Sequence, residues 1–321
     1  MDPAGHLWVF VSGRGKKWPG FVYCNARPHD IGRFERVSEH EFTYPQPRWI
    51  EGEGFLQLFT KYTGVRELYW STSKDGKSWS PDQKMAGIGG HYQTSHQRGK
   101  KVFTAFNRHP EGNVDRRTDL FFLQTDDAGR TWQNVKGERV EVPVVAPKNP
   151  ALVRDYFAEK RLVYIHDLDL DRQGQPVILY TTNAGYQPGP GGDPRWWTIA
   201  RWTGNKWEFS AVTRANHNYT TGSLYLDDNS WRIIGPTAPG PQPTGSDGEA
   251  TVWASRDEGK TWSRERAVTQ GSSMNHNYVR RPIDAHPDFY AFWADGNADV
   301  LSPSRLINPS RTEPRNPAYY Q

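Results

Sequence analysis

Hydrophobic residues along this chain occur in short runs, and few of them follow the three- and four-residue spacing of an amphipathic helix. The runs are separated by turns rich in Gly, Pro, Asn and Asp, and they recur about every eight to twelve residues, as in all-β proteins. Only Asn149–Glu159 is expected to form a short helix or turn. Strands are predicted at Leu7–Val11, Phe21–Cys24, Phe55–Lys61, Glu67–Thr72, Lys101–Phe106, Leu120–Gln124, Arg161–Ile165, Val177–Thr182, Trp196–Trp202, Ser223–Leu226, Trp231–Gly235, Ala250–Ala254 and Phe289–Ala294.

One turn sequence, S/T-x-D-x-G-x-T-W, occurs after three of these predicted strands. Its Asp suits hydrogen bonds to turn amides, its Gly suits a positive φ, and its Trp can pack on the next strand. The Asp residues are separated by 52 and 130 residues, close to one and three units of about 40 to 50 residues. This spacing predicts a β-propeller of six to seven four-stranded blades. The copies are Ser73–Trp79, shortened by one residue, Thr125–Trp132 and Ser255–Trp262.

The composition agrees with one all-β domain over residues 1–321, ending in an irregular tail from about residue 308. The chain has 30 Gly, 24 Pro and 14 Trp, and no Ser/Gly run or charge block that would mark a linker. A net charge of +4 permits an anionic partner. Dispersed Lys and Arg without a known motif argue against nucleic acid, and no apolar run has the length of a membrane span. We expect a monomer.

Polar residues gather in several short groups that would lie at strand ends. Histidine and tyrosine near Arg or Lys suit acid–base chemistry on an anionic substrate, although each His is also explained as a turn residue whose hydrogen bonds are satisfied. The sequence Asn-His-Asn-Tyr occurs twice, 59 residues apart, which suggests equivalent loops in two blades. The groups contain Tyr44, His91, Tyr92, Asn107, His109, His217, Tyr219, His276, Arg280, Arg281 and His286.

No cofactor is required by these residues, and no pair of Cys or His has zinc spacing. Asp167, Asp169 and Asp171 alternate along one segment. They suit either a structural Ca²⁺ site or a solvated strand face.

The three turns resemble the Asp box of bacterial neuraminidase repeats, which is found in sialidase-like β-propellers. The wider sequence, including Val37–Pro47, Gly90–Gln93, Asn216–Tyr219 and Ala285–Gly296, is similar to a repeat-containing family that resembles ulvan-lyase-type polysaccharide lyases. This resemblance covers about residues 5 to 306. It implies that the Asp boxes are structural turns on the rim and that Asp75, Asp127 and Asp257 have no catalytic role.

The same resemblance implies roles for four residues. Tyr44 would donate or accept a proton in β-elimination, and Lys61 would neutralise the uronate carboxylate, where the lyases carry Arg. Tyr92 and His109 would hold the sugar or share the proton transfer. An essential His of the relatives falls before Met1, so we expect the chain to be shortened at its N terminus.

The favoured function is therefore a polysaccharide lyase acting on an anionic, uronate-containing oligo- or polysaccharide. One alternative is a sialidase-like glycoside hydrolase using carboxylates such as Asp167, Asp193, Asp288 or Asp295. The other is a non-catalytic glycan-binding propeller, in which Trp49, Trp196, Trp197 and Trp293 would stack on sugars. The family resemblance implies a periplasmic or extracellular protein, although Met1–Gly5 does not resemble the start of a signal peptide.

Overall fold

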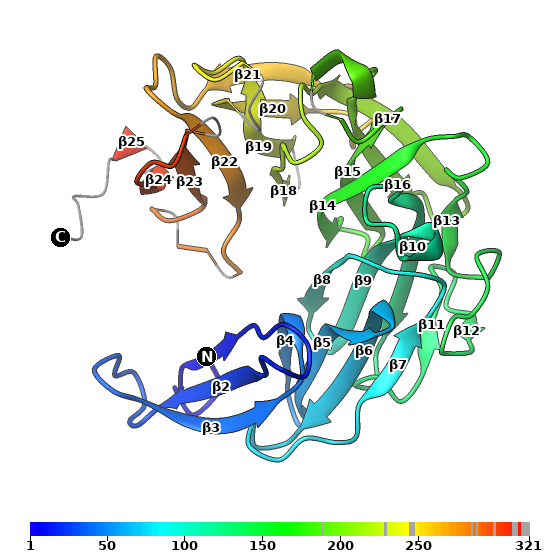
Figure 1. Cartoon of the computed structure of the whole chain (residues 1–321), viewed down its shortest axis with the longest axis vertical. Helices are drawn as coiled ribbons and strands as arrows, with labels where there is room; N and C mark the ends of the chain where they lie inside the picture. The colour runs from blue at the N-terminus through cyan, green and yellow to red at the C-terminus, as the bar shows by residue number, and fades with distance from the viewer. Residues whose placement is uncertain are drawn as a thin grey trace. The chain divides into compact units, whose positions relative to one another are not determined.

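The strands of this chain form antiparallel sheets that are the blades of a six-bladed β-propeller (Figure 1). The computed structural model describes residues 1–187, 189–227, 230–243, 248–283, 285–286, 288–297, 300–309 and 314–315. Within these residues there are six sheets, and no helix is long and apolar enough to cross a membrane. The predicted all-β propeller is thus confirmed. The chain divides into two compact units, Met1–Asp155 and Tyr156–Gln321.

The first unit contains three blades. The first blade has three strands, and the second has four in the order β4-β5-β6-β7. The third blade has five strands in the order β12-β11-β10-β9-β8, and a sixth strand, β13, also pairs with β10. The strands are β1 (Trp8–Val11), β2 (Gly20–Asn25), β3 (Phe34–His40), β4 (Thr43–Ile50), β5 (Gly54–Thr63), β6 (Val65–Ser73), β7 (Gln83–Ala86), β8 (Gln93–Arg98), β9 (Lys101–Arg108), β10 (Thr118–Thr125), β11 (Trp132–Gln133), β12 (Arg139–Val140) and β13 (Leu152–Arg154).

The second unit contains three four-stranded blades, each with its strands in sequence order. Those strands are β14 (Leu162–Leu170), β15 (Pro176–Asn183), β16 (Trp196–Trp202), β17 (Trp207–Arg214), β18 (Ser223–Asp227), β19 (Ser230–Ala238), β20 (Glu249–Ser255), β21 (Ser263–Ala267), β22 (Asn275–Arg280), β23 (Phe292–Gly296), β24 (Leu306–Pro309) and β25 (Pro314–Arg315).

The expected helix or turn at Asn149–Glu159 is wrong as a helix. The Asn149 side chain accepts a hydrogen bond from the Ala151 amide at 2.8 Å and forms a turn, after which β13 pairs with β10. Two short 3₁₀ helices lie elsewhere, at Pro110–Gly112 and Gly189–Gly192.

The three Asp boxes are structural turns, as predicted. Asp75 Oδ1 accepts hydrogen bonds from the amides of Lys77 and Ser78 at 2.9 and 2.8 Å, and Asp257 Oδ1 accepts one from Thr261 at 2.9 Å. Their glycines have positive φ angles, which glycine adopts without steric cost. These carboxylates are therefore occupied by their own turns.

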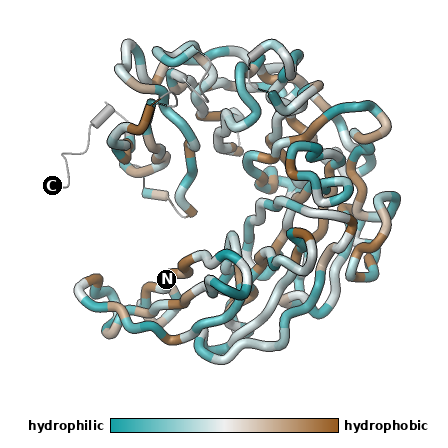
Figure 2. The backbone as a smooth tube through the Cα atoms, viewed as in Figure 1, coloured by the Kyte–Doolittle hydropathy of each residue, from teal (hydrophilic) through white to brown (hydrophobic). Residues whose placement is uncertain are grey.

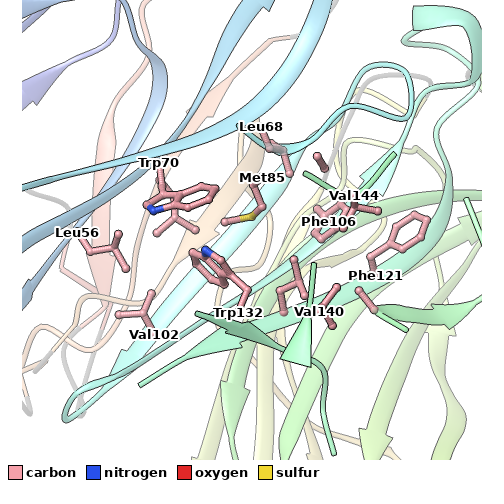
Figure 3. Packing of buried hydrophobic residues seen from close by; sticks show 14 of the residues in the cluster. Leu56, Leu68, Trp70, Met85, Val102, Phe106, Phe121, Trp132, Val140 and Val144 are labelled. Atoms are coloured by element: carbon pink, nitrogen blue, oxygen red, sulfur yellow. The ribbon is translucent and has the colours of Figure 1, made fainter. Parts of the chain in front are cut away.

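Hydrophobic side chains between adjacent sheets form the cores. Trp70 and Trp132, from the second and third blades, meet edge to face at 5.5 Å beside Met85 (Figure 3). Figure 2 shows hydrophobic residues recurring along the strands. Trp197 and Trp293 are 0% and 1% exposed in the cores of the second unit, so their expected role as sugar-stacking platforms is wrong.

Candidate functional site

Three aromatic rings meet at one end of the second and third blades. Tyr44 lies at the start of β4, Tyr92 immediately precedes β8, and His109 immediately follows β9. The ring centroids of Tyr44 and Tyr92 are 5.7 Å apart, and those of Tyr92 and His109 are 4.9 Å apart. The Asp box after β6 lies at the opposite end of its sheet, because antiparallel strands alternate in direction. The structure thus brings together three of the predicted residues.

Tyr44 has an unusual backbone conformation. Its φ is +53°, at a register shift between β4 and β5, and its amide donates a hydrogen bond to Ser12 Oγ at 3.0 Å. A non-glycine residue in this region costs about 1–3 kcal/mol and is common at functional sites. Tyr44 as a whole residue is 45% exposed, so it is open to solvent.

Arg66, which the sequence did not single out, is the cation of this cluster. Its guanidinium lies over the rings of Tyr44, Tyr62 and Tyr92 at 5.5, 5.1 and 4.6 Å. Its Nη2 donates to Tyr62 Oη at 2.7 Å, and its Nη1 donates to Tyr92 Oη. Arg117 covers Tyr92 as well, at 4.5 Å. We name these residues, Tyr44, Tyr62, Arg66, Tyr92, His109 and Arg117, the tyrosine–arginine cluster.

Lys61, the cation expected from the sequence, is held by carboxylates. Its Nζ lies 2.7 Å from Asp82 and 3.8 Å from Glu41. Burial alone would lower its pKa, but the hydrogen bond and charge of Asp82 outweigh burial and raise it. Two carboxylates therefore already offset the Lys61 charge, whereas among the described residues the Arg66 guanidinium contacts phenols and aromatic rings.

His91 and Asn107 support the cluster from behind. His91 is 0% exposed, with Nδ1 2.8 Å from the Asn107 carbonyl oxygen and Nε2 accepting from the Ile88 amide at 3.3 Å. Asn107 Oδ1 accepts from the Tyr92 amide at 3.0 Å. Both were expected to bind substrate. Their burial instead favours a positioning role, in which Asn107 holds the Tyr92 backbone and His91 bonds to Asn107.

Tyr44 and His109 are both uncharged at neutral pH. Burial and the neighbouring Tyr92 raise the pKa of Tyr44, although Arg66 opposes this. Burial, followed by the charge of Arg117, lowers the pKa of His109 to about 2. Within the part of the chain that the structure describes, Nε2 of His109 is buried without a hydrogen-bond partner. Other buried atoms of the described chain share this state, among them His166 Nδ1, so the position of His109 beside Tyr92, and not the unpaired nitrogen alone, marks it as part of the site.

The remaining predicted residues belong to the second unit, where they form separate groups. His217 and Tyr219 lie 5.6 Å apart, and Tyr219 also meets Tyr164 at 5.6 Å. Arg280 lies over Tyr278 at 5.4 Å, while Arg281 Nη1 is 2.7 Å from Asp169 Oδ2. The His286 side chain is 72% exposed beside Asp288. Within this unit, the structure does not bring these residues into one cluster.

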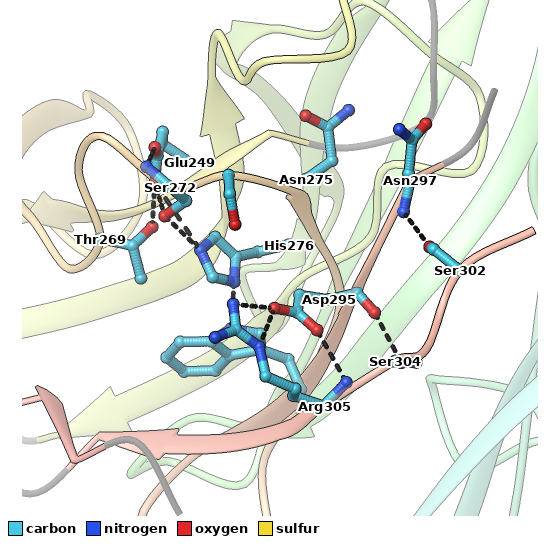
Figure 4. A network of polar contacts seen from close by, with 12 residues as sticks. Glu249, Thr269, Ser272, Asn275, His276, Asp295, Asn297, Ser302, Ser304 and Arg305 are labelled. Carbon is cyan, nitrogen blue, oxygen red and sulfur yellow. Dashed lines mark hydrogen bonds and ion pairs between the residues drawn. The ribbon is translucent and has the colours of Figure 1, made fainter. Parts of the chain in front are cut away.

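His276 lies in a saturated polar network (Figure 4). Trp293 Nε1 donates to His276 Nδ1 at 2.9 Å, so Nε2 must carry the proton of the neutral ring and donate to Ser272 Oγ at 2.8 Å. Ser272 Oγ in turn donates to Glu249 at 2.9 Å. Because the imidazole donates to the serine, it cannot act as a base toward it, which argues against a serine nucleophile here.

The candidate calcium ligands are all engaged by protein groups. Among the described residues no three His, Cys, Asp or Glu side chains gather as a metal site. Asp167 Oδ2 accepts from the Leu224 amide at 2.9 Å, and Asp171 Oδ1 accepts from the Gln173 amide at 2.9 Å. Asp169 and Asp171 are buried, so the expected solvated face is wrong for them. A structural calcium ion stays a prediction.

Comparison with known proteins gives the same fold with a related sequence. The chain is 25% identical over 351 residues to an ulvan lyase, PL25, of Pseudoalteromonas sp. (strain PLSV), covering 93% of this chain and 68% of that protein. A PL25 ulvan lyase structure bound to -[GlcA(1-4)Rha3S]- matches with a TM-score of 0.81 at 17% identity, over 98% of this chain and 78% of the other. The polysaccharide lyase Uly1 matches with a TM-score of 0.63 at 14% identity, over 96% and 76%. Residues 2–215 match the BNR repeat family, and the chain is therefore a BNR repeat-containing family member.

Proposed function

We propose that the tyrosine–arginine cluster is the active site of a polysaccharide lyase that cleaves a uronate-containing polysaccharide by β-elimination. The observation that carries this proposal is the position of Arg66, which contacts Tyr44 and Tyr92 together. A guanidinium binds a carboxylate through two parallel hydrogen bonds, so it can hold a uronate next to both phenols.

In this reaction the proton on the carbon next to the carboxylate is removed. The electron pair forms a carbon–carbon double bond, the glycosidic oxygen on the adjacent carbon leaves, and that oxygen takes up a proton. The transient negative charge spreads onto the carboxylate, where a preorganised cation stabilises it most. Arg66 and Arg117 supply positive charge at this point.

The two phenols suit the two proton transfers. Tyr44, like any tyrosine, keeps its proton at neutral pH, and its raised pKa extends this to higher pH, so we assign it to protonate the leaving oxygen. We assign Tyr92 Oη, which accepts a hydrogen bond from Arg66, to take the proton from carbon as a phenolate and so to become a phenol. Tyr44 becomes a phenolate when it protonates the leaving oxygen, and proton exchange with solvent restores both groups before the next cut. His109 packs against Tyr92 and, because its pKa of about 2 makes it a weak base, we assign it to hold the sugar and give it no part in the proton transfer.

The related lyase structure bound to a glucuronate–sulfated rhamnose saccharide supports an anionic glycan as the substrate class. A periplasmic or extracellular location is proposed with it, since such polymers lie outside the cell. A hydrolase would need two carboxylates facing each other. Of the expected ones, Asp193 and Asp295 are each paired with an arginine, Arg195 and Arg305.

The test is to incubate the protein with uronate-containing polysaccharides, including a sulfated glucuronate–rhamnose polymer, and to follow ultraviolet absorbance and reducing ends in parallel. β-Elimination produces both signals, because each cut creates an unsaturated uronate. New reducing ends without an increase in absorbance would contradict the lyase proposal and indicate a hydrolase. Glycan binding with neither signal would leave a binding propeller.

A further inference from the structure

A short basic loop lies beside the tyrosine–arginine cluster, between β1 and β2. We define the basic loop as residues 12–19, Ser-Gly-Arg-Gly-Lys-Lys-Trp-Pro. It carries the cations Arg14, Lys16 and Lys17 and no acidic residue. Trp18 at its end is 63% exposed, unusual for so large an apolar side chain.

The loop is anchored at the site by two hydrogen bonds and passes close to Tyr62. Ser12 Oγ accepts the hydrogen bond from the Tyr44 amide at 3.0 Å, and the Gly13 amide donates to the Phe42 carbonyl at 3.0 Å. A methyl group at Gly15 would lie 3.8 Å from the ring of Tyr62, which Arg66 contacts. The basic loop therefore starts at the backbone of Tyr44 and passes the edge of the cluster.

Backbone hydrogen bonds hold the loop in a tight turn. The Arg14 amide donates to the Trp18 carbonyl at 2.6 Å, and the Trp18 amide donates to the Gly15 carbonyl at 3.1 Å. A Cβ at Gly13 would lie 2.3 Å from the Trp18 carbonyl oxygen, so glycine is needed for this return. The turn depends on the backbone, and the Arg, Lys and Trp side chains remain available to a ligand.

The charges of the loop have no acidic partner among the residues that the structure describes. Over the residues that the structure describes, Arg14, Lys16 and Lys17 make no ion pair, and Lys17 Nζ lies 5.6 Å from the centre of the Trp18 ring. An aromatic face next to several cations suits a sugar ring that carries a negative group.

We propose that the basic loop is a substrate subsite, resting on the function proposed above. In it Trp18 stacks on the sugar that neighbours the cleaved uronate, and the cations bind an anionic group on that sugar. The loop thereby selects polymers with negative charge on successive sugars over those with isolated uronates. The anionic group is a sulfate ester or a second carboxylate, and the cations of the basic loop can bind either one.

The experiment compares the Lys16→Ala/Lys17→Ala double variant and Trp18→Ala with wild type on a sulfated glucuronate–rhamnose polysaccharide. The matched control is Lys100→Ala/Lys101→Ala, which removes the same charge at the β8–β9 turn, the end of that hairpin away from Tyr92. Each loop variant should raise KM about tenfold with kcat unchanged, as expected for a few exposed contacts. The difference in KM between the double variant and wild type should become smaller at high salt, since exposed charges are screened.

Repeating the comparison with the desulfated polymer identifies the group. If the rise in KM of the Lys16→Ala/Lys17→Ala variant disappears with the desulfated polymer, the loop binds sulfate. If the rise in KM persists, the loop binds a second carboxylate. An unchanged KM in both loop variants, or an equal change in the control, overturns the subsite.

Binding titrations with the same polymer separate this inference from the function. If no variant and no wild-type sample eliminates, but the loop variants lose affinity and the control does not, the subsite stands and the lyase fails. If elimination proceeds with loop-independent KM and affinity, the lyase stands and the subsite fails.

Discussion

Two histidines of this protein, His276 and His109, are both buried but differ in their hydrogen bonding. His276, in the second unit, has both ring nitrogens hydrogen-bonded, to Trp293 and Ser272. His109, in the first unit, packs on Tyr92 and keeps a buried nitrogen with no partner in the described chain. A saturated buried network contributes stability, whereas an unpaired buried polar group costs stability. Among the described residues His166 Nδ1 is also unpaired, so what assigns His109 to a reactive site is its contact with Tyr92 in the tyrosine–arginine cluster.

Of the variants that test this comparison, Tyr44→Phe is expected to have the largest effect, a loss of kcat. Removing a proton-transferring phenol should lower kcat by about 10²- to 10⁴-fold with the fold intact, because the ring is kept. Tyr278→Phe is the matched control, since Tyr278 has the same φ of +53° and the same 45% exposure in the second unit. Equal activity of the two variants would remove Tyr44 from the mechanism.

Arg66→Ala tests which cation faces the substrate. It should lower kcat/KM by about 100-fold, because it removes the charged group that donates hydrogen bonds to Tyr62 and Tyr92. Lys61→Ala should lower it only a few-fold, because Asp82 and Glu41 already offset that charge. A larger loss in the Lys61 variant would restore the role that the sequence predicted.

His276→Ala should reduce stability while sparing activity. Truncation leaves the Trp293 indole and Ser272 without a partner and opens a cavity, together costing about 3 kcal/mol in the free energy of unfolding by urea. His286→Ala, at an exposed position, should change that free energy by less than about 0.5 kcal/mol. If His276→Ala lowered kcat at unchanged stability, the network would be functional.

The smallest expected effect is the change of kcat with pH. His109 has a pKa of about 2 and is uncharged above it, and the raised pKa of Tyr44 keeps its phenol protonated beyond its ordinary value of about 10. These groups should therefore change kcat by less than about twofold between pH 5 and 9, with loss at higher pH as Tyr44 deprotonates. An inflection near pH 6.5 that disappears in His109→Asn would contradict the assignment.

The sequence predicted the parts of the structure that depend on local contacts. In an Asp box the carboxylate bonds amides two to four residues away, so the motif alone identifies the turn. The spacing of the boxes likewise indicated the propeller. Tyr44, Tyr92 and His109 were found because they lie at strand ends in recognisable groups.

Arg66 and Trp18 were missed because nothing in their own segments distinguishes them. Arg66 joins the cluster only through the hairpin register that pairs Tyr62 with Arg66 and Lys61 with Glu67. Trp18 is one of 14 tryptophans, and only the structure shows it exposed while Trp197 and Trp293 are buried.

The sequence by itself determined the all-β propeller, the positions of its rim turns and the set of residues from which a site could be built. Tertiary structure alone decided which polar atoms remain available, placing His91 and Asn107 in the interior and Arg66 among three tyrosine rings. The physical reason is that turn chemistry acts over a few bonds along the chain. Burial and the pairing of charges are set by neighbours that are distant in sequence.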